Sequence, residues 1–283
     1  MSGRLFIVST PIGNLGDITP RVKQALTEST LVLAEDTRVS IKLLHHLGLS
    51  KRLLSCHDFN EGKRLSMLDE IHENGQSAAI MSDAGTPLVS DPGFQIVRKA
   101  IQLGMQIVPI PGPSAALAAL VGSGLPCERF AFEGFLPDKA GEREKRLERL
   151  RDDERTLIFY VAPHNLRAML ADMLASFGDR PACLARELTK LYEEFRRESL
   201  SELLAYAEVE TPRGEIVIIV GGAEAQTERR FPEADVVRRL EELLGSGGRL
   251  KDIASVLAKE TGWASSEVYK LGLDIKEGRD RQA

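Results

Sequence analysis

Three short loops rich in glycine, proline and other small residues are the first candidates for chemistry. They read "STPIGNLGDIT" at residues 9–19, "SDAGTP" at 82–87 and "PGPSAA" at 111–116. Each loop joins a strand-like run to a helical pattern, and small side chains let a ligand approach the backbone closely. One such loop is most simply a turn. Three of them predict a site for a flat or extended cofactor, because the strands of a parallel sheet end at one common edge.

The usual nucleotide and nucleophile signatures are absent. No GxxxxGK[ST] run occurs, no GxGxxG follows the first strand, and no GxSxG elbow nominates a serine. The sequence therefore indicates a cofactor that binds without a phosphate loop.

Polar residues that could handle a proton or a phosphate follow three further strands. They lie in "AEDTR" at 34–38, "CHDFNE" at 56–61 and "RELTK" at 186–190. A side chain that accepts or steers a proton must stand within hydrogen-bond reach of it. We nominate Asp36 or Lys190 for proton handling and Arg38 and Arg186 for phosphate contacts. The alternative for each is a surface ion pair or a loop-stabilising hydrogen bond.

Strand-like and helical patterns alternate along the first half of the chain, which is typical of a parallel α/β sheet. Strands are expected at 5–8, 31–34, 53–56, 78–81 and 107–110, with helices near 38–47, 61–74 and 92–103. Thr19-Pro20 and Asp91-Pro92 each predict a helix start, with an N-cap followed by proline. Helix begins again at Ser114, after the break at residues 111–113.

The second half repeats the alternation and then turns purely helical. Strands are expected at 130–135, 156–161, 182–185 and 215–220 and in the β-like run 191–200, and a charged helix, "GEREKRLERL", is expected to present a solvated face. We predict α/β domains at 1–118 and 119–231 and a small helical domain at 232–283. In the last, Ala258, Gly262 and Val268 have the spacing of a helix-turn-helix, which fits a nucleic-acid reader or a plain helical hairpin equally well.

Composition narrows the class of protein. The chain has 283 residues, a net charge of −5 and a pI of about 5.7, so no global positive field attracts nucleic acid. Its three cysteines are far apart and expected to be buried, and neither they nor the five histidines have metal-ligand spacing. The N-terminus is not typical of a signal peptide and no apolar run has the length of a membrane span. We expect a cytoplasmic protein without metal.

Several consecutive runs resemble the ribosomal RNA small subunit methyltransferase I family. They are "VSTPIGNLGDIT", "AEDTR", "SDAGTPLVSDPG", "PIPGPSAALAAL", "FEGFLP", "TLIFY" and "ARELTK", in that order, and the resemblance covers residues 4–222. This family belongs to the tetrapyrrole-methylase-like, class III methyltransferases. The resemblance implies two α/β domains of that type with a cleft between them, plus a small helical C-terminal segment.

The resemblance also implies an activity. S-adenosyl-L-methionine is the expected methyl donor, a homodimer is the expected assembly, and the expected partner is small-subunit ribosomal RNA or the assembled small ribosomal subunit. The expected methyl acceptor is the ribose 2′-oxygen of a cytidine in the decoding region. Methyl transfer from a sulfonium needs positioning and water exclusion more than a nucleophile or a metal.

Site residues follow from the resemblance, motif by motif. Cofactor contacts are expected at Pro11, Gly13, Ser82, Asp83, Ala84, Gly85, Thr86, Ser114, Ala115, Phe159, Tyr160, Ala185, Gly214 and Glu215. Catalytic roles are assigned to Asp36, Arg38, Glu187 and Lys190, and contacts with substrate RNA to Asn14, Glu35, His57, Asn60 and Arg186.

One motif departs from the family, and two other functions stay open. In "FYVAPHNL", Val161 and Asn165 stand where the family has glutamate and arginine, as if a charge pair had been lost together. A tetrapyrrole or corrin methyltransferase would share the fold but typically carries a Gly-Pro-Gly-Asp-type first loop in place of "TPIGNL". A non-catalytic RNA-binding protein on a methylase fold is the third possibility.

Overall fold

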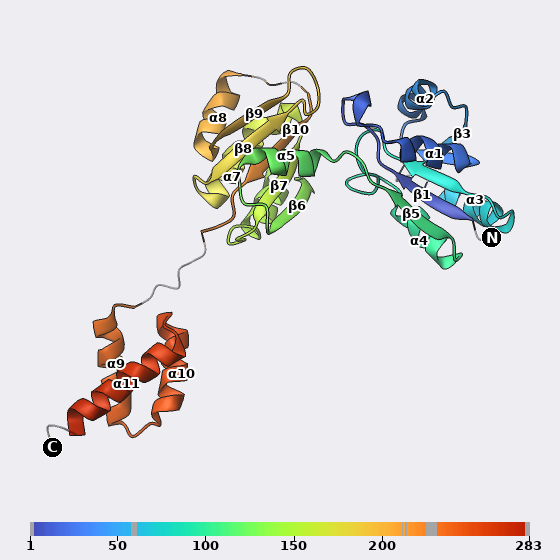
Figure 1. Cartoon of the computed structure of the whole chain (residues 1–283). Coiled ribbons are helices and arrows are strands. Elements are labelled where there is room, and N and C mark those ends of the chain that lie inside the picture. The colour runs from blue at the N-terminus through green and yellow to red at the C-terminus, as the bar shows by residue number, and fades with distance from the viewer. Residues whose placement is uncertain (1–2, 58–60, 211, 213, 225–230, 281–283) are drawn as a thin grey trace. The chain divides into compact units, whose positions relative to one another are not determined.

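The computed structural model describes residues 3–57, 61–210, 212, 214–224 and 231–280. They form two compact units, residues 1–222 and 223–283. The first unit contains two five-stranded sheets (Figure 1). The predicted domain boundary at residue 118 falls, in sequence, after the last strand of the first sheet and before the first strand of the second. This division into two domains stays a proposal.

The first sheet is parallel throughout and has the order β3-β2-β4-β1-β5. Its strands are β1 (Arg4–Val8), β2 (Leu31–Ala34), β3 (Arg52–Ser55), β4 (Ala78–Met81) and β5 (Gln106–Ile110), and its helices are α1 (Pro20–Glu28), α2 (Thr37–His46), α3 (Glu61–Glu73) and α4 (Phe94–Gln102), with a 3-10 turn at Leu15–Asp17. The parallel α/β prediction is confirmed.

Two apolar cores cover the two faces of this sheet. Phe6 and Val8 pack with helices α1 and α2, whereas Leu5 packs with α3 and α4. Successive strand residues point to opposite faces, so the nearly continuous apolar runs of the strands are what burial on both faces requires. Because the five strands are parallel, they all end at one edge of the sheet, where the loops begin.

The second sheet is mixed and has the order β6-β7-β10-β8-β9. Only β6 and β7 pair in parallel; β10 runs antiparallel to both β7 and β8, and β8 runs antiparallel to β9. Its elements are α5 (Ala115–Ser123), β6 (Phe130–Phe135), α6 (Ala140–Glu148), β7 (Thr156–Val161), α7 (Leu166–Phe177), β8 (Pro181–Arg186), β9 (Glu194–Ser199), α8 (Leu200–Val209) and β10 (Ile216–Val220), with a 3-10 turn at Pro163–Asn165.

Helices α6, α7 and α8 cover one face of the second sheet, and α5 covers the other. Helix α5 follows directly from the last strand of the first sheet, and Ile12 from the loop after β1 joins the same apolar cluster. One face of the second sheet is thus covered by two segments, α5 and the loop with Ile12, that follow strands of the first sheet in the sequence.

The C-terminal unit consists of α9 (Glu233–Gly245), α10 (Leu250–Thr261) and α11 (Ser265–Asp280). Leu257 and Val268 are fully buried in its core, and Gly262 ends α10 in the left-handed conformation. The expected helical tail is confirmed, whereas its role as a nucleic-acid reader stays a prediction. Among the described residues, no helix is both long and apolar enough to cross a lipid bilayer.

Two sequence expectations were wrong. Asp91 does not cap a helix, because α4 begins only at Phe94 and its N-cap is Gly93. Cys127 is exposed, although Cys56 and Cys183 are buried as expected.

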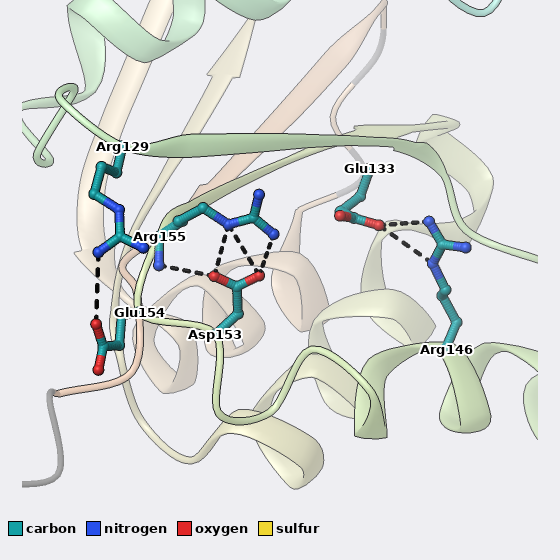
Figure 2. Close-up of polar contacts among 6 residues, drawn as sticks. All are labelled: Arg129, Glu133, Arg146, Asp153, Glu154 and Arg155. Atoms are coloured by element: carbon teal, nitrogen blue, oxygen red, sulfur yellow. Dashed lines mark hydrogen bonds and ion pairs between the residues drawn. The ribbon is translucent and has the colours of Figure 1, made fainter.

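Figure 2 shows three pairs of charged residues around β6 and β7. Arg155 binds Asp153 at 2.6 Å, Arg146 binds Glu133 at 2.5 Å, and Arg129 lies 3.7 Å from Glu154. The solvated face predicted for the charged helix is confirmed for most of α6. Arg143 is the exception, because it is 5% exposed.

Arg143 ties α6 to α7 through a buried ion pair. Its Nε lies 2.6 Å from Asp172 Oδ2, and its Nη1 donates to the carbonyl oxygens of Pro137 and Asp138. Removing one member of such a pair leaves an uncompensated charge, which costs far more than losing a surface pair.

We predict that Arg143→Ala lowers the free energy of unfolding by about 3 kcal/mol, because Asp172 loses its partner in a half-buried position. The matched control is Arg151→Ala, which removes an exposed pair with Glu148 and should change the free energy by less than about 0.5 kcal/mol. Urea unfolding of both variants measures the difference. Equal effects would show that the buried pair contributes no more than a surface one.

Candidate active site

The three small-residue loops meet at the carboxyl edge of the first sheet, as predicted. Thr10 and Gly85 exchange two backbone hydrogen bonds, of 2.8 and 3.1 Å, which join the first loop to the second. Thr86 Oγ1 donates to Pro113 O at 3.2 Å and joins the second loop to the third. Ser82, which is 2% exposed, fixes the second loop from inside by donating to Gly85 O.

The second sheet supplies the opposite wall. Residues along β7 alternate, so that Phe159 faces the α6–α8 core whereas Tyr160 faces α5. The backbone N–H of Ala116 hydrogen-bonds the Tyr160 phenol, and burial raises the pKa of that phenol. Phe135 meets the Tyr160 ring edge-on at 5.4 Å. Aromatic surface thus stands directly beside the third loop.

Between these walls lies a cavity of about 410 Å³. Its lining comes from both sheets and comprises Ile12, Glu35, Asp83, Ala84, Gly85, Thr86, Val89, Ser90, Asp91, Ser114, Ala115, Phe135, Tyr160, Val161, Ala162, Pro163, Gly214, Glu215, Ile216 and Val217. This volume suits a ligand of cofactor size.

The charges of the lining are one-sided. Four carboxylates face the cavity, those of Glu35, Asp83, Asp91 and Glu215, and none of the described lining residues is Lys or Arg. A ligand with several phosphates would be repelled here, whereas a ligand with positive charges is favoured. The N-terminus of α5, with Ser114 as N-cap, adds a local positive end where one small anionic group can be held.

Most of the expected cofactor residues line the cavity. Asp83, Ala84, Gly85, Thr86, Ser114, Ala115, Tyr160, Gly214 and Glu215 do so, together with Glu35, which was expected to contact RNA. Pro11, Gly13 and Ser82 lie in the same loops without lining it. Phe159 is fully buried in the α6–α8 core, on the opposite side of β7 from Tyr160, as strand alternation requires. Ala185 is fully buried on the same face as Val217, in the cluster that α5 covers, without lining the cavity.

Sequence reasoning missed several lining residues. Val89, Ser90 and Asp91 come from the segment after "SDAGTP", and Phe135, Ala162 and Pro163 come from the ends of β6 and β7. The repeated Ser-Asp of residues 90–91 was a usable signal. It was assigned to a helix cap instead.

Asp36 and Arg38 lie beside the cavity without lining it. Asp36 is the N-cap of α2, and its Oδ1 accepts from the Arg38 backbone N–H at 2.8 Å. The Arg38 side chain donates to both carboxylate oxygens of Asp36. These hydrogen bonds lower the pKa of Asp36 to about 2, so this carboxylate is a weak proton acceptor at neutral pH.

Lys190 stands where parts of both sheets converge. Its Nζ lies 3.0 Å from Glu187 Oε1 and 3.9 Å from Glu215 Oε2. A Cβ added at Gly13 would come within 2.6 Å of Lys190 Cγ, so only glycine permits this approach. Glu187 adopts a left-handed φ of 50° in the turn that holds the lysine. Non-glycine residues with such strained backbone conformations cluster at functional sites.

The remaining candidates are spread around the site. Asn14 is exposed and caps the 3-10 turn, where it accepts from Gly16 N at 2.9 Å. Arg186 is half-buried and pairs with Glu194 at 2.5 Å. His57 is half-buried after β3 and does not line the cavity, and Asn60 lies outside the described residues.

The two departures from the family pattern have separate environments. Val161 is buried in the α6–α8 core and also borders the cavity. Asn165 donates through Nδ2 to Asp138 Oδ1 at 2.7 Å. Neither position leaves a buried charge without a partner, which agrees with joint loss of a pair.

In the part of the chain that the structure describes, no group of three or more His, Cys, Asp or Glu residues is placed to hold a metal ion.

Comparison with known proteins decides the family. The model of the tetrapyrrole (corrin/porphyrin) methylases matches residues 4–204. The chain is 46% identical to ribosomal RNA small subunit methyltransferase I of Pseudomonas aeruginosa, over 96% of this chain and 97% of that protein. The chain belongs to the ribosomal RNA small subunit methyltransferase I family of tetrapyrrole methylases.

Other members and distant structures agree with this assignment. The family member of the same name from Mesorhizobium japonicum is also 46% identical, over 96% of this chain and 92% of that protein. The crystal structure of uroporphyrin-III-C-methyltransferase from Thermus thermophilus has a TM-score of 0.55 and 19% identity, covering 78% of this chain and 95% of that one. At that identity it shows the common fold alone.

We predict that the Asp36 carboxyl titrates at about pH 2 in the folded protein and that Arg38→Ala raises its midpoint only part of the way toward the ordinary value of about 4, because the backbone N–H of residue 38 still donates to it. Because the folded-state pKa lies below the unfolded value, the associated stability is present above about pH 4 and is lost as the pH falls toward 2. Carbon-13 NMR of the side-chain carboxyl measures both midpoints. An unshifted Asp36 midpoint in the wild-type protein would contradict the pairing.

Proposed function

We propose that this protein transfers a methyl group from S-adenosyl-L-methionine to a ribose 2′-oxygen of a cytidine in small-subunit ribosomal RNA. The observation that carries the proposal is the cavity between the two sheets, with its acidic lining and its loops of small residues. Relatives of 40 to 46% identity over nearly the whole chain are named for methylation of the small ribosomal subunit's RNA.

The residues present fit this donor. Its positive charges suit the four carboxylates, and its carboxylate suits the N-terminus of α5 at Ser114 and Ala115. Tyr160, Phe135 and Val217 offer the apolar and aromatic surface that an adenine ring needs. When bound, S-adenosyl-L-methionine supplies an electrophilic methyl group on a sulfonium.

The chain's own part is to position, to exclude water and to manage one proton. The hydrogen bonds that join the three loops fix one wall, and the Tyr160–Ala116 hydrogen bond fixes it against the other. Rigid walls limit the ways in which donor and acceptor can meet. Asp83 is held in place by accepting the Asp36 backbone N–H at 3.0 Å.

Lys190 is our candidate for stabilising the ribose oxygen as it loses its proton. Its ammonium lies beside Glu187 and beside Glu215, which lines the cavity, its stem packs on Gly13, and the Glu187 carboxylate fixes its direction. A preorganised cation beside a developing oxyanion is a common source of rate enhancement. Asp36 is a weaker candidate for proton handling because of its low pKa.

The other expected partners stay proposals. Arg38, whose side chain is 88% exposed, can contact RNA phosphates from the rim, and so can Arg186. A homodimer and a cytoplasmic location follow from the resemblance and from the substrate. Binding of RNA by the C-terminal helices rests on the helix-turn-helix spacing.

A tetrapyrrole substrate is less well supported. The structures whose titles name such substrates share only 17 to 19% identity with this chain. Their likeness reports the fold, and the fold serves unrelated substrates.

The proposal predicts that tritium from methyl-labelled S-adenosyl-L-methionine appears in small-subunit ribosomal RNA when the full chain is supplied. Nuclease digestion should place the label on a ribose 2′-oxygen. Isolated small subunits and free ribosomal RNA serve as parallel substrates, and large-subunit RNA is the control. Label that appears only in a tetrapyrrole, or in no substrate while the donor binds, would overturn the proposed reaction.

Replacing Lys190 by methionine removes the charge but keeps an unbranched side chain of nearly the same length. We expect kcat to fall by about 10²-fold or more, with donor affinity changed less than about threefold, because the ammonium acts on the acceptor oxygen. Lys190→Arg should recover part of the rate. A fall in donor affinity that accounts for the whole loss would instead assign Lys190 to the cofactor.

A further inference from the structure

Asp91 holds a position that neither the loop motifs nor the expected helix cap explains. The chain between Gly85 and α4 contains left-handed residues at Leu88, with φ of 71°, and at Ser90, with φ of 69°. Such conformations are unfavourable for non-glycine residues and persist only where the surrounding structure holds them. This coil ends at Gly93, and it keeps Asp91 in the cavity lining rather than at the start of α4.

The neighbours of Asp91 come from four elements. Glu35 follows β2 and Asp83 follows β4, and the negative charges of both act on the Asp91 carboxyl group. Tyr160 belongs to β7, and the charge of Asp91 acts on its phenol. The Ser82 side chain forms a hydrogen bond with it. Glu215 completes the charged lining from the start of β10.

This environment favours the protonated carboxyl. Burial, and then the charge of Glu35, raise the pKa of Asp91 to about 7, although the Ser82 hydrogen bond offsets part of the rise. Near neutral pH the group is therefore divided between its two states in the ligand-free protein. A positive charge placed in the same cavity shifts that balance toward the carboxylate.

We propose that Asp91 senses the charge of the methyl donor. It releases its proton to solvent when the cationic sulfonium compound occupies the cavity, and it takes a proton from solvent when the uncharged thioether product is left there. The inference rests on the proposed function, because it assumes that the cavity holds S-adenosyl-L-methionine. It assigns to Asp91 the discrimination between donor and product.

Two of the other lining carboxylates are less suited to this role. Burial raises the pKa of Asp83 as well, but the Asp36 backbone N–H, which donates to it at 3.0 Å, and the Arg38 charge offset part of that rise. Glu215 is 68% exposed at its side chain and lies 3.9 Å from Lys190. A group that solvent and a cation already stabilise changes its protonation little when a further cation arrives.

Isothermal titration calorimetry of the full chain tests the inference without requiring RNA. Titrations at pH 6.5 with S-adenosyl-L-methionine and with S-adenosyl-L-homocysteine, in buffers of different ionisation enthalpy, give the protons exchanged by each ligand. We expect more than about half a proton released per donor bound and much less for the product. Donor affinity should rise several-fold, by at most about tenfold per pH unit, between pH 6 and pH 8, whereas product affinity stays flatter.

Asp91→Asn keeps the shape of the side chain and removes its proton exchange. The variant should bind the donor without proton release, and its donor-to-product affinity ratio should fall toward one. Glu35→Gln should lower the midpoint of the pH dependence, since it removes a neighbouring negative charge. Asp69→Asn is the matched control, because Asp69 lies on α3 in a pair with Lys99 at 2.7 Å, and it should leave proton release unchanged.

The outcomes separate the two proposals. Absence of donor binding by the wild-type protein would overturn the proposed function itself. Donor binding with equal proton release for donor and product, or with release unchanged in Asp91→Asn, would overturn the role of Asp91 alone. Should the asparagine variant not fold, the comparison of donor with product in the wild-type protein still decides.

Discussion

The site depends on how one face of the second sheet is buried. That face presents Ile158, Ala185, Val217 and Ile219, and it is covered by α5 together with Ile12. Helix α5 follows the first sheet's last strand after the loop at residues 111–114, and Ile12 belongs to the loop after its first strand. Burial of this apolar surface therefore holds the loop edge of one sheet against the other. The cavity is the space that this arrangement leaves beside the loops.

The composition of the cavity follows from the same arrangement. The loops must carry small side chains where they approach one another. The charged side chains of the lining therefore lie at the ends of strands and in the coil before α4. Four carboxylates gather there without a lysine or arginine in the described lining. A carboxylate cluster without a cation is costly in a partly dry site, and a cationic ligand relieves that cost. The acidic lining and a sulfonium donor are thus mutually consistent.

Two charged groups near the cavity have opposite properties because their partners differ. Asp36 is held ionised by Arg38, whereas Asp91 lies among carboxylates and is pushed toward its neutral form. The sequence offers both as Asp residues in loops that lead into a helix. The packing of Arg38 on one, and the burial of the other beside Glu35, separate a fixed charge from a proton-exchanging one.

The sequence by itself determined the parallel sheet, the three loops at its edge and the family. These depend on local patterns, such as apolar runs, N-caps and consecutive motif residues, which each segment carries alone. Tertiary structure alone decided that the second sheet is mixed, that Phe159 turns away while Tyr160 faces the cavity, and that Asp91 lines it. The physical reason is that strand direction, side-chain facing and burial depend on contacts with distant segments, which no single stretch of sequence contains.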